Sequence, residues 1–193
     1  IHNMCAAMID KFGSQALRDK YLPRALTMET FFSYCLTEPG SGSDAAALKT
    51  KALKSNTDFT LTGTKAFISG GGYSDAYIVM ARTGAEGPKG VSAFMIEDGT
   101  VGLSFGGLED KMGWRSQPTR QVQMDAAQAP AENLLGDEGR GFTYAMMGLD
   151  GGRLNIGACS LGGAQRCLDE AIAYTKDRKQ FDQPVADFQN TQF

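Results

Sequence analysis

The stretch from Asp58 to Arg82 reads DFTLTGTKAFISGGGYSDAYIVMAR, and it decides the fold class that we expect for this chain. Short runs of β-branched and aromatic residues alternate in it with glycines and other turn residues, a pattern typical of β-strands joined by tight turns. No helical spacing of apolar residues separates these runs. The short connections therefore favour an antiparallel sheet, closed into a barrel or a sandwich, over a parallel sheet of the Rossmann type.

The same texture extends from about Phe31 to Pro130. Each candidate strand is a short apolar or β-branched run that Gly, Asn or Asp residues separate from the next. The candidate strands are Phe31–Leu36, Leu48–Leu53, Asp58–Thr62, Lys65–Ser69, Ala76–Arg82, Val91–Glu97 and Gln121–Met124. This central region is predicted to form one β domain.

Helical patterns flank the β region. In residues 4–26 apolar side chains recur at helical spacing, and we expect helices that are broken at Gly13 and ended by Pro23. After Gly141 the spacing predicts a long amphipathic helix. The predicted fold class is α+β, with a central antiparallel β-barrel domain at 31–135 flanked by helical segments at 1–30 and 136–193.

Two glycines complicate the second helical segment. Gly151 and Gly152 each cost up to about 1 kcal/mol relative to alanine in a helix interior. They mark either a helix start that Asp150 caps or a weak point in a longer helix, and the pattern leaves both interpretations open.

Charge and composition exclude several classes of function. A net charge of −3 without a block of Lys or Arg argues against a nucleic-acid partner, and no apolar run is long enough for membrane insertion. The widely spaced Cys5, Cys35, Cys159 and Cys167 are expected to be reduced and buried, with no metal site. The single histidine, His2, is expected to be an ordinary surface side chain, which disfavours a Ser-His-Asp triad.

A glycine-rich turn follows the first candidate strand. Residues 37–44 read TEPGSGSD and combine two permissive glycines with hydroxyls and free backbone N–H groups. Such a turn can wrap an anion such as a pyrophosphate, because glycine permits close approach and successive N–H groups point at the oxygens. A polar surface turn is the alternative, since short glycine-rich patterns are common.

A second motif lies about thirty residues further on. Residues 64–72 read TKAFISGGG, which places Phe67 and Ser69 on the same side of a strand before three glycines. Phe67 could stack on a flavin ring and Ser69 could hydrogen-bond its edge. The alternative is a core phenylalanine followed by a flexible hairpin loop.

Taken in order, three motifs closely resemble the acyl-CoA dehydrogenase family. They are YCLTEPGSGSD at 34–44, KAFISG at 65–70 and RKQF at 178–181, and the resemblance covers nearly the whole chain. The stretch GWRSQPTR at 113–120 is most similar to the isobutyryl-CoA dehydrogenase branch.

The resemblance implies a fold and an activity. In this family a helical domain, a β-barrel and a helical bundle enclose FAD, and the enzyme removes hydrogens from the α and β carbons of an acyl-CoA to give a 2-enoyl-CoA. The chain resembles the end of the first domain, all of the second and the start of the third, so it is expected to be a fragment. Implied partners are acyl-CoA, electron-transfer flavoprotein and identical subunits in a homodimer or homotetramer, in bacterial cytoplasm or mitochondrial matrix.

Matching motif positions also imply site residues. FAD would be contacted by Tyr34, Leu36, Thr37, Gly42, Ser43, Phe67, Ile68 and Ser69, and a neighbouring subunit's FAD by Arg178, Gln180, Phe181, Phe188 and Gln189. Ser43, Asp150 and Arg153 would contact acyl-CoA. Ser69 is expected beside the reactive nitrogen of the flavin, where a hydroxyl stabilises arriving charge.

No catalytic base is predicted within the chain. Dehydrogenation needs a carboxylate that removes the α proton. The resemblance places this glutamate beyond Phe193, or in one branch at the position that Gly152 holds here, and Glu38 is expected to be structural. Two other readings stay open: a flavin- and CoA-binding or assembly piece without turnover, and an acyl-CoA oxidase-like relative that reacts flavin with oxygen.

Overall fold

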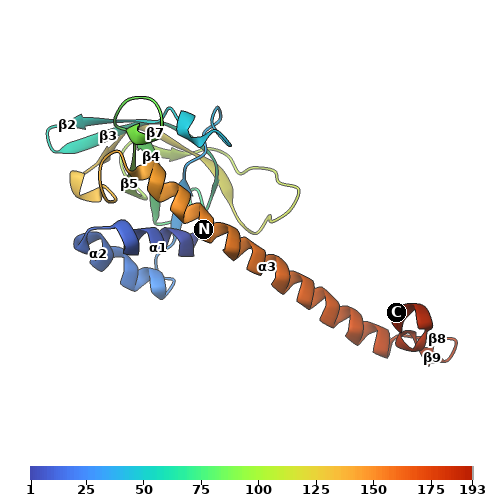
Figure 1. Ribbon diagram of the computed structural model, residues 1–193. Helices are drawn as coiled ribbons and strands as arrows, with labels where there is room; N and C mark the ends of the chain where they lie inside the picture. The colour runs from blue at the N-terminus through green and yellow to red at the C-terminus, as the bar shows by residue number, and fades with distance from the viewer. Residues whose placement is uncertain (193) are drawn as a thin grey trace. The chain divides into compact units, whose positions relative to one another are not determined.

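The computed structural model describes residues 1–192 and divides the chain into two compact units, 1–150 and 151–193, which are described separately (Figure 1). The fold is mixed α+β, which confirms the predicted class. The long helix α3 (Gly141–Asp177) begins in the first unit and continues in the second. No helix within the described range is long and apolar enough to cross a membrane.

Two helices open the first unit. Helix α1 (His2–Phe12) ends at Gly13, and Ser14 caps α2 (Gln15–Leu26) by accepting a hydrogen bond from Leu17 N. The prediction that Pro23 ends the second helix is wrong, because α2 runs through it to Leu26. Proline removes one backbone donor, but burial of Ala25, which is 2% exposed, holds the last turn in place.

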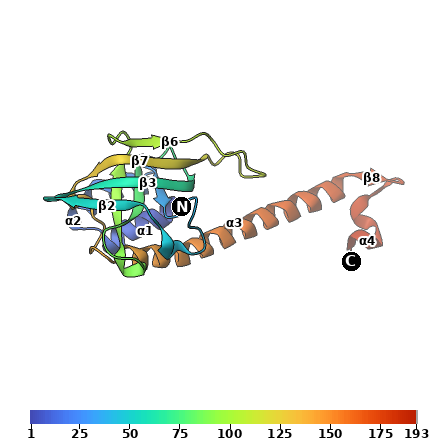
Figure 2. The same ribbon diagram turned by 90° about the horizontal axis from the view of Figure 1, so that it is seen from above.

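Seven strands form one curled sheet. They are β1 (Phe32–Cys35), β2 (Lys51–Ser55), β3 (Asp58–Ser69), β4 (Ala76–Arg82), β5 (Val91–Glu97), β6 (Leu103–Phe105) and β7 (Thr119–Ala129). Their order is β1-β4-β2-β3-β7-β6, with β5 also on β4, and Figure 2 shows β2, β3, β7 and β6 side by side. Strand β3 joins two predicted strands across Gly63, and the three-residue strand β6 was not predicted.

The sheet is not antiparallel throughout, which corrects one expectation. Strand β1 pairs with β4 in parallel, from Phe32 opposite Ala76 to Cys35 opposite Val79, and β2 meets the end of β4 in parallel through Lys51 and Arg82. Parallel neighbours need a long connection between them. Here the antiparallel hairpin of β2 and β3 lies within that connection.

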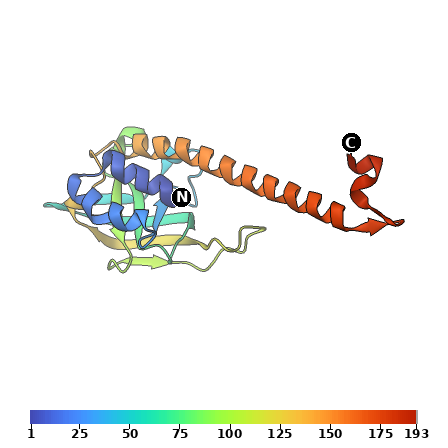
Figure 3. The ribbon, with the colours of Figure 1, turned by 90° about the horizontal axis from the view of Figure 1, so that it is seen from below.

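Strands β4 and β5 are buried on both faces. Ala76, Ile78 and Met80 of β4 pack with α1 and α2, which lie on one side of the sheet (Figures 1 and 3). Tyr77 and Val79 point the other way, into a second apolar cluster inside the curl of the sheet. Two faces of one strand therefore serve two cores, which fixes its register strongly.

The second unit is smaller. After α3 it contains β8 (Lys179–Gln180), β9 (Gln183–Pro184) and α4 (Gln189–Gln192). Short 3-10 helices complete the chain: η1 (Ala45–Ala47), η2 (Pro88–Gly90), η3 (Ala131–Asn133) and η4 (Val185–Asp187). Gly151 and Gly152 lie in the interior of α3, so they do not mark a helix start.

Two further expectations are corrected. Cys5 and Cys35 are buried, whereas Cys159 and Cys167 are exposed on α3. His2 is half-buried instead of lying freely on the surface: Phe32 N donates to its Nδ1, its Nε2 lies 3.1 Å from Ala25 O, and its ring stacks on Phe32. Among residues 1–192 no three His, Cys, Asp or Glu side chains are grouped to hold a metal ion.

Candidate functional site

The glycine-rich turn is anchored by a buried carboxylate. Glu38 Oε2 accepts a hydrogen bond from Lys49 N at 2.6 Å, and Oε1 accepts from Thr50 N at 2.9 Å and from Lys65 Nζ at 2.8 Å. Lys65 is 0% exposed and also donates to Leu36 O. The carboxylate therefore ties the turn to β3 and to the two residues that precede β2.

Electrostatics favour the ionised form of Glu38. Burial by itself would raise the pKa of this carboxyl, but the Lys65 ammonium and the hydrogen bonds from Lys65, Thr50 and Lys49 outweigh it and hold the pKa below its usual value. Burial lowers the pKa of Lys65, and Glu38 opposes that shift. Both carboxylate oxygens of Glu38 therefore already have donors within the protein.

The tip of the turn leaves donors for a ligand. Glu38 and Ser41 exchange two backbone hydrogen bonds, and Ser41 Oγ donates to Asp44 O, which closes the base of the turn. Gly42 and Ser43 are exposed beyond it. In the part of the chain that the structure describes, no protein group accepts a hydrogen bond from their N–H groups. These donors fit an anion.

Some predicted flavin contacts have buried side chains. Tyr34 is 9% exposed and its hydroxyl donates to Ala145 O at 3.1 Å; burial raises the pKa of this phenol, which keeps it a donor. Leu36 and Ile68 also lie in apolar clusters. Contacts from these three residues to a ligand would have to come from the main chain. Thr37 is half-buried, so its side chain can also reach a ligand.

A β-bulge presents Phe67. In the pairing of β3 with β7 the register shifts between Lys65 and Ile68, and Phe67 lies in the left-handed region at φ 58°. The bulge buries both Lys65 and Ala66 and turns Phe67 outward, where it is 67% exposed. A non-glycine residue in this conformation is strained, and such strain is typical of functional positions.

Ser69 lies next to a tightly built glycine loop. Ser33 Oγ donates to Ser69 O and is also hydrogen-bonded to Ser74 Oγ, and a Cβ on Gly70 (φ +82°) would come within 2.7 Å of Ser33 Oγ. Gly70 is therefore required both by its conformation and by the close approach. Ser69 Oγ itself has no hydrogen-bond partner among residues 1–192, so it is available to a ligand.

The structure brings the two motifs together. Ala66 N donates to Thr37 O at 2.8 Å, and Lys65 of the second motif bonds Glu38 of the first. Exposed amides at the turn, an exposed aromatic ring and a free hydroxyl are thus held on adjoining strand ends. This set fits a flavin nucleotide, which needs donors for its pyrophosphate and an aromatic face with a polar edge contact for its ring.

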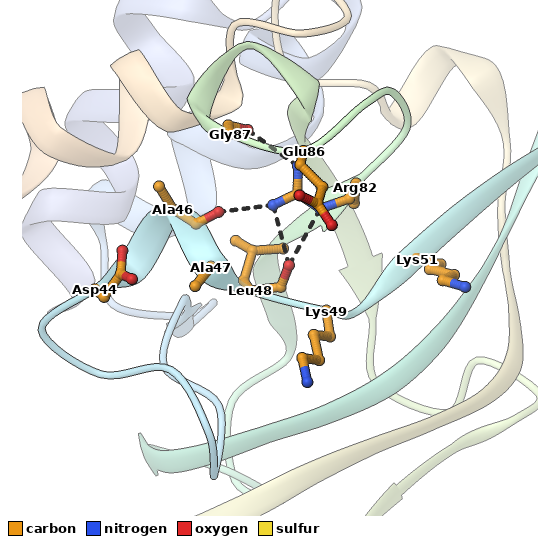
Figure 4. Close-up of a pocket in the computed structure, with 9 residues that line it drawn as sticks. All are labelled: Asp44, Ala46, Ala47, Leu48, Lys49, Lys51, Arg82, Glu86 and Gly87. Carbon is orange, nitrogen blue, oxygen red and sulfur yellow. Dashed lines mark hydrogen bonds between the residues drawn. The ribbon is translucent and has the colours of Figure 1, made fainter.

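A pocket of about 600 Å³ opens beside the turn (Figure 4). One wall is the segment 44–51 and the other is formed by Arg82, Glu86 and Gly87. Lys49 and Lys51 add positive charge at its rim, against Asp44 and Glu86. The pocket begins at Asp44, directly after the predicted acyl-CoA contact Ser43.

The predicted residues of the second helical segment fall in two groups. Asp150 and Arg153 lie three residues apart within the continuous helix α3 and are both exposed. Arg178, Gln180, Phe181, Phe188 and Gln189 gather around the hairpin of β8 and β9 in the second unit.

The hairpin itself has a two-residue turn. Phe181 and Asp182 both have positive φ, at 52° and 62°, as a type I′ turn requires. Phe181 is 89% exposed, and its ring contacts Phe188 edge-on at 6.3 Å.

Sequence reasoning missed Arg82 and the partner of Glu38. Lys65 could have been found, because a lysine within an apolar strand needs a buried anion. Arg82 ends an apolar strand next to a loop, and nothing in that pattern indicates where its side chain goes.

Two family models match the chain. Residues 33–127 match the acyl-CoA dehydrogenase middle-domain model, and residues 139–193 match the acyl-CoA dehydrogenase C-terminal-domain model. The chain belongs to the acyl-CoA dehydrogenase family. Members of this family are FAD-dependent oxidoreductases.

Relatives point to one branch of the family. The mitochondrial isobutyryl-CoA dehydrogenase of Dictyostelium discoideum is 57% identical over the whole chain, which is 47% of that protein; the Bos taurus protein of the same name is 54% identical and is covered to 46%. The structure of butyryl-CoA dehydrogenase from Megasphaera elsdenii has a TM-score of 0.93 and 42% identity, over 98% of this chain and 50% of that one. The chain thus spans about half the length of the relatives it matches.

Proposed function

We propose that this chain carries the flavin-binding and much of the acyl-CoA-binding surface of an enzyme that oxidises a short, branched acyl-CoA of the isobutyryl type to the 2-enoyl-CoA. The observation that carries the proposal is the junction of the two motifs: free N–H groups at Gly42 and Ser43 lie in a turn bonded to the strand that presents Phe67 and Ser69. The identity to isobutyryl-CoA dehydrogenases supports the choice of acyl group.

Each residue of the two motifs would contact a particular part of the flavin nucleotide. Gly42 and Ser43 would bind the pyrophosphate through their N–H groups, Phe67 would stack on the ring, and the Ser69 hydroxyl would donate to the ring edge where negative charge develops. When bound, FAD supplies the hydride acceptor of the reaction. Main-chain groups of Tyr34, Leu36 and Ile68, together with the half-buried Thr37, would complete the flavin contacts.

The chain would also contact acyl-CoA. Ser43, Asp150 and Arg153 are proposed to contact its CoA portion, and the pocket beside Asp44 lies next to the first of them. Arg178, Gln180, Phe181, Phe188 and Gln189 would bind the FAD of a second subunit in a homodimer or homotetramer, since an arginine fork suits a pyrophosphate. Electron-transfer flavoprotein is the proposed acceptor, and the mitochondrial matrix or bacterial cytoplasm is the proposed compartment.

The proposal includes the absence of a base from residues 1–193. Both carboxylate oxygens of Glu38 are occupied by backbone and lysine donors, and Gly152 has no side chain to offer. Without a base near the α proton, the chain alone would bind acyl-CoA but not dehydrogenate it.

The test is an anaerobic titration of the FAD-loaded chain with isobutyryl-CoA, followed by the visible flavin spectrum. A saturable shift of the oxidised spectrum without bleaching is the expected result, because substrate then lies beside the flavin and no base acts. Bleaching would show that a base lies within these residues. An unchanged spectrum would contradict the placement of acyl-CoA beside the flavin. Comparing oxygen uptake with anaerobic dye reduction in the bleaching case separates an oxidase from a dehydrogenase.

A further inference from the structure

Arg82 lies where the two walls of the pocket beside Asp44 meet. It is the last residue of β4, and the loop 83–90 leads from it to β5. Its backbone N donates to Thr50 O at 2.7 Å, so the main chain already joins this strand end to the segment that precedes β2. The side chain continues the same connection into the pocket (Figure 4).

All five N–H groups of the guanidinium are used, and all bind backbone carbonyls. On the first wall, NH2 donates to Ala46 O at 2.7 Å and to Leu48 O at 3.1 Å, and Nε donates to Leu48 O at 3.2 Å. On the second wall, NH1 donates to Ala85 O at 2.6 Å and to Gly87 O at 3.0 Å. One side chain therefore connects η1, and Leu48 directly after it, to the loop 83–90.

The loop is folded closely around this guanidinium. Thr83 N and Gly84 N both donate to Gly90 O, and a Cβ on Gly90 would lie 1.8 Å from Ala85 O and 2.9 Å from Arg82 NH1. Only glycine fits there without a shift of the loop. Arg82 and Gly90 together therefore hold the wall formed by residues 85–87 in a single position.

The charge of Arg82 is not neutralised by a carboxylate. Its partners are carbonyl oxygens, and within the described range no ion pair includes it. With Lys49 and Lys51 against Asp44 and Glu86, the lining of the pocket has an excess of positive charge. Such a lining favours a phosphate-bearing ligand.

We infer that Arg82 is a positioning residue that sets the width of this pocket and thereby the affinity for the CoA portion of the substrate. The inference rests on the proposed function for the identity of the ligand, but not for the role of Arg82 in holding the walls. Lysine cannot replace arginine in that role, because an ammonium has three donors at one point while this site uses a planar fork that reaches in two directions.

The first measurement needs no ligand. Hydrogen exchange on the whole 193-residue chain would be compared between the wild type, Arg82→Lys, Gly90→Ala and the matched control Arg24→Lys, whose exposed guanidinium pairs with Glu29. We expect Arg82→Lys to lower protection at least about tenfold in 44–51 and 83–90, with β3 and β7 unchanged. Gly90→Ala should loosen 83–90 without removing the guanidinium, and the control should change neither segment. Unchanged exchange in both segments of Arg82→Lys would overturn the inference.

The second measurement uses coenzyme A and FAD as separate probes by calorimetry. Arg82→Lys should weaken coenzyme A binding about tenfold while FAD affinity stays within about twofold, because only the CoA pocket loses its shape. Equal weakening of both ligands, or of neither, would overturn the role of Arg82 in CoA affinity. Failure of the wild type to bind coenzyme A would instead overturn the proposed function, and the exchange data would still decide whether Arg82 holds the walls.

Discussion

The two units differ in how far they bury large apolar side chains. In the first unit two clusters bury residues such as Phe59, Leu61 and Ile78 to 1% exposure or less. In the second unit no residue from 151 to 192 is buried, and Leu154 and Leu161 are 78% and 74% exposed. The first unit has its own core, whereas the second presents an apolar helix surface.

This difference separates two kinds of site residue. Gly42, Ser43, Phe67 and Ser69 are carried by strand ends fixed to a core, so their geometry is set within one unit. The residues around the hairpin of β8 and β9 are held by the local strand pairing and by the contact between Phe181 and Phe188, without buried residues from 151 to 192. An exposed apolar face of this kind is typical of a surface that another protein surface covers, in keeping with the proposed subunit contact.

The largest expected effect comes from breaking the buried ion pair. Lys65→Met should lower the free energy of unfolding by about 3 to 5 kcal/mol, because it leaves the Glu38 carboxylate buried without its cation. The matched variant Arg166→Met removes an exposed pair with Glu170 on α3 and should cost less than about 1 kcal/mol. Urea denaturation measures both. The double variant E38Q/K65M should recover part of the loss, and equal costs in the two single variants would contradict the comparison.

Leu61 in the first unit and Leu161 in the second test the same difference in burial with uncharged side chains. Leu61→Ala should cost about 2 to 5 kcal/mol, because Leu61 is 0% exposed and a cavity would remain. Leu161→Ala should change the free energy of unfolding by less than about 0.5 kcal/mol, since its side chain is already in solvent. A large cost at Leu161 in urea denaturation would show that the second unit has a core of its own.

Acid titration isolates the contribution of Glu38. Its pKa in the folded chain is below the ordinary 4.5, so the stability that depends on its charge is present above that value and is lost as pH falls through the lowered pKa. The difference in unfolding free energy between wild type and Glu38→Gln should therefore be largest near neutral pH and shrink below pH 4.5. A difference that stays constant down to pH 3 would mean that the charge of Glu38 does not stabilise the turn.

The smallest expected effect on stability is at Phe67. Phe67→Gly should change the free energy of unfolding by no more than about 1 kcal/mol, because the residue is exposed and glycine adopts positive φ without strain. FAD affinity should nevertheless fall about tenfold, since a stacked aromatic contact is lost. Phe67→Trp is the control that keeps the stack. Unchanged FAD affinity in Phe67→Gly would remove Phe67 from the site.

Much of the fold follows from local pattern. Strands β4 and β5 were predicted to the residue, because both are continuous apolar runs between clear turn signals. The parallel pairing of β1 with β4 was not predicted, because it depends on how the hairpin of β2 and β3 folds back. Exposure of Cys159 and Cys167 was missed for a similar reason: an apolar helix face does not reveal whether its covering surface lies in the same chain.

The motifs predicted which residues belong to the candidate site, but not the contacts that hold those residues in place. The sequence placed Phe67 and Ser69 on one side of a strand, and in the structure Phe67 is exposed and Ser69 is half-buried, with Ile68 buried between them. It gave no sign of the bulge that exposes Phe67, because a register shift depends on the opposing strand β7. The four carbonyl partners of Arg82 come from η1, from Leu48 and from the loop 83–90, and such long-range contacts leave no local signal.

The claim that the first unit holds a flavin is tested most directly by equilibrium titration of the chain with FAD, followed by flavin fluorescence. The account predicts saturable quenching at one FAD per chain and a higher unfolding temperature with FAD, because a ligand that binds the folded state stabilises it. A folded chain whose unfolding temperature and flavin signal do not change with FAD would contradict the account.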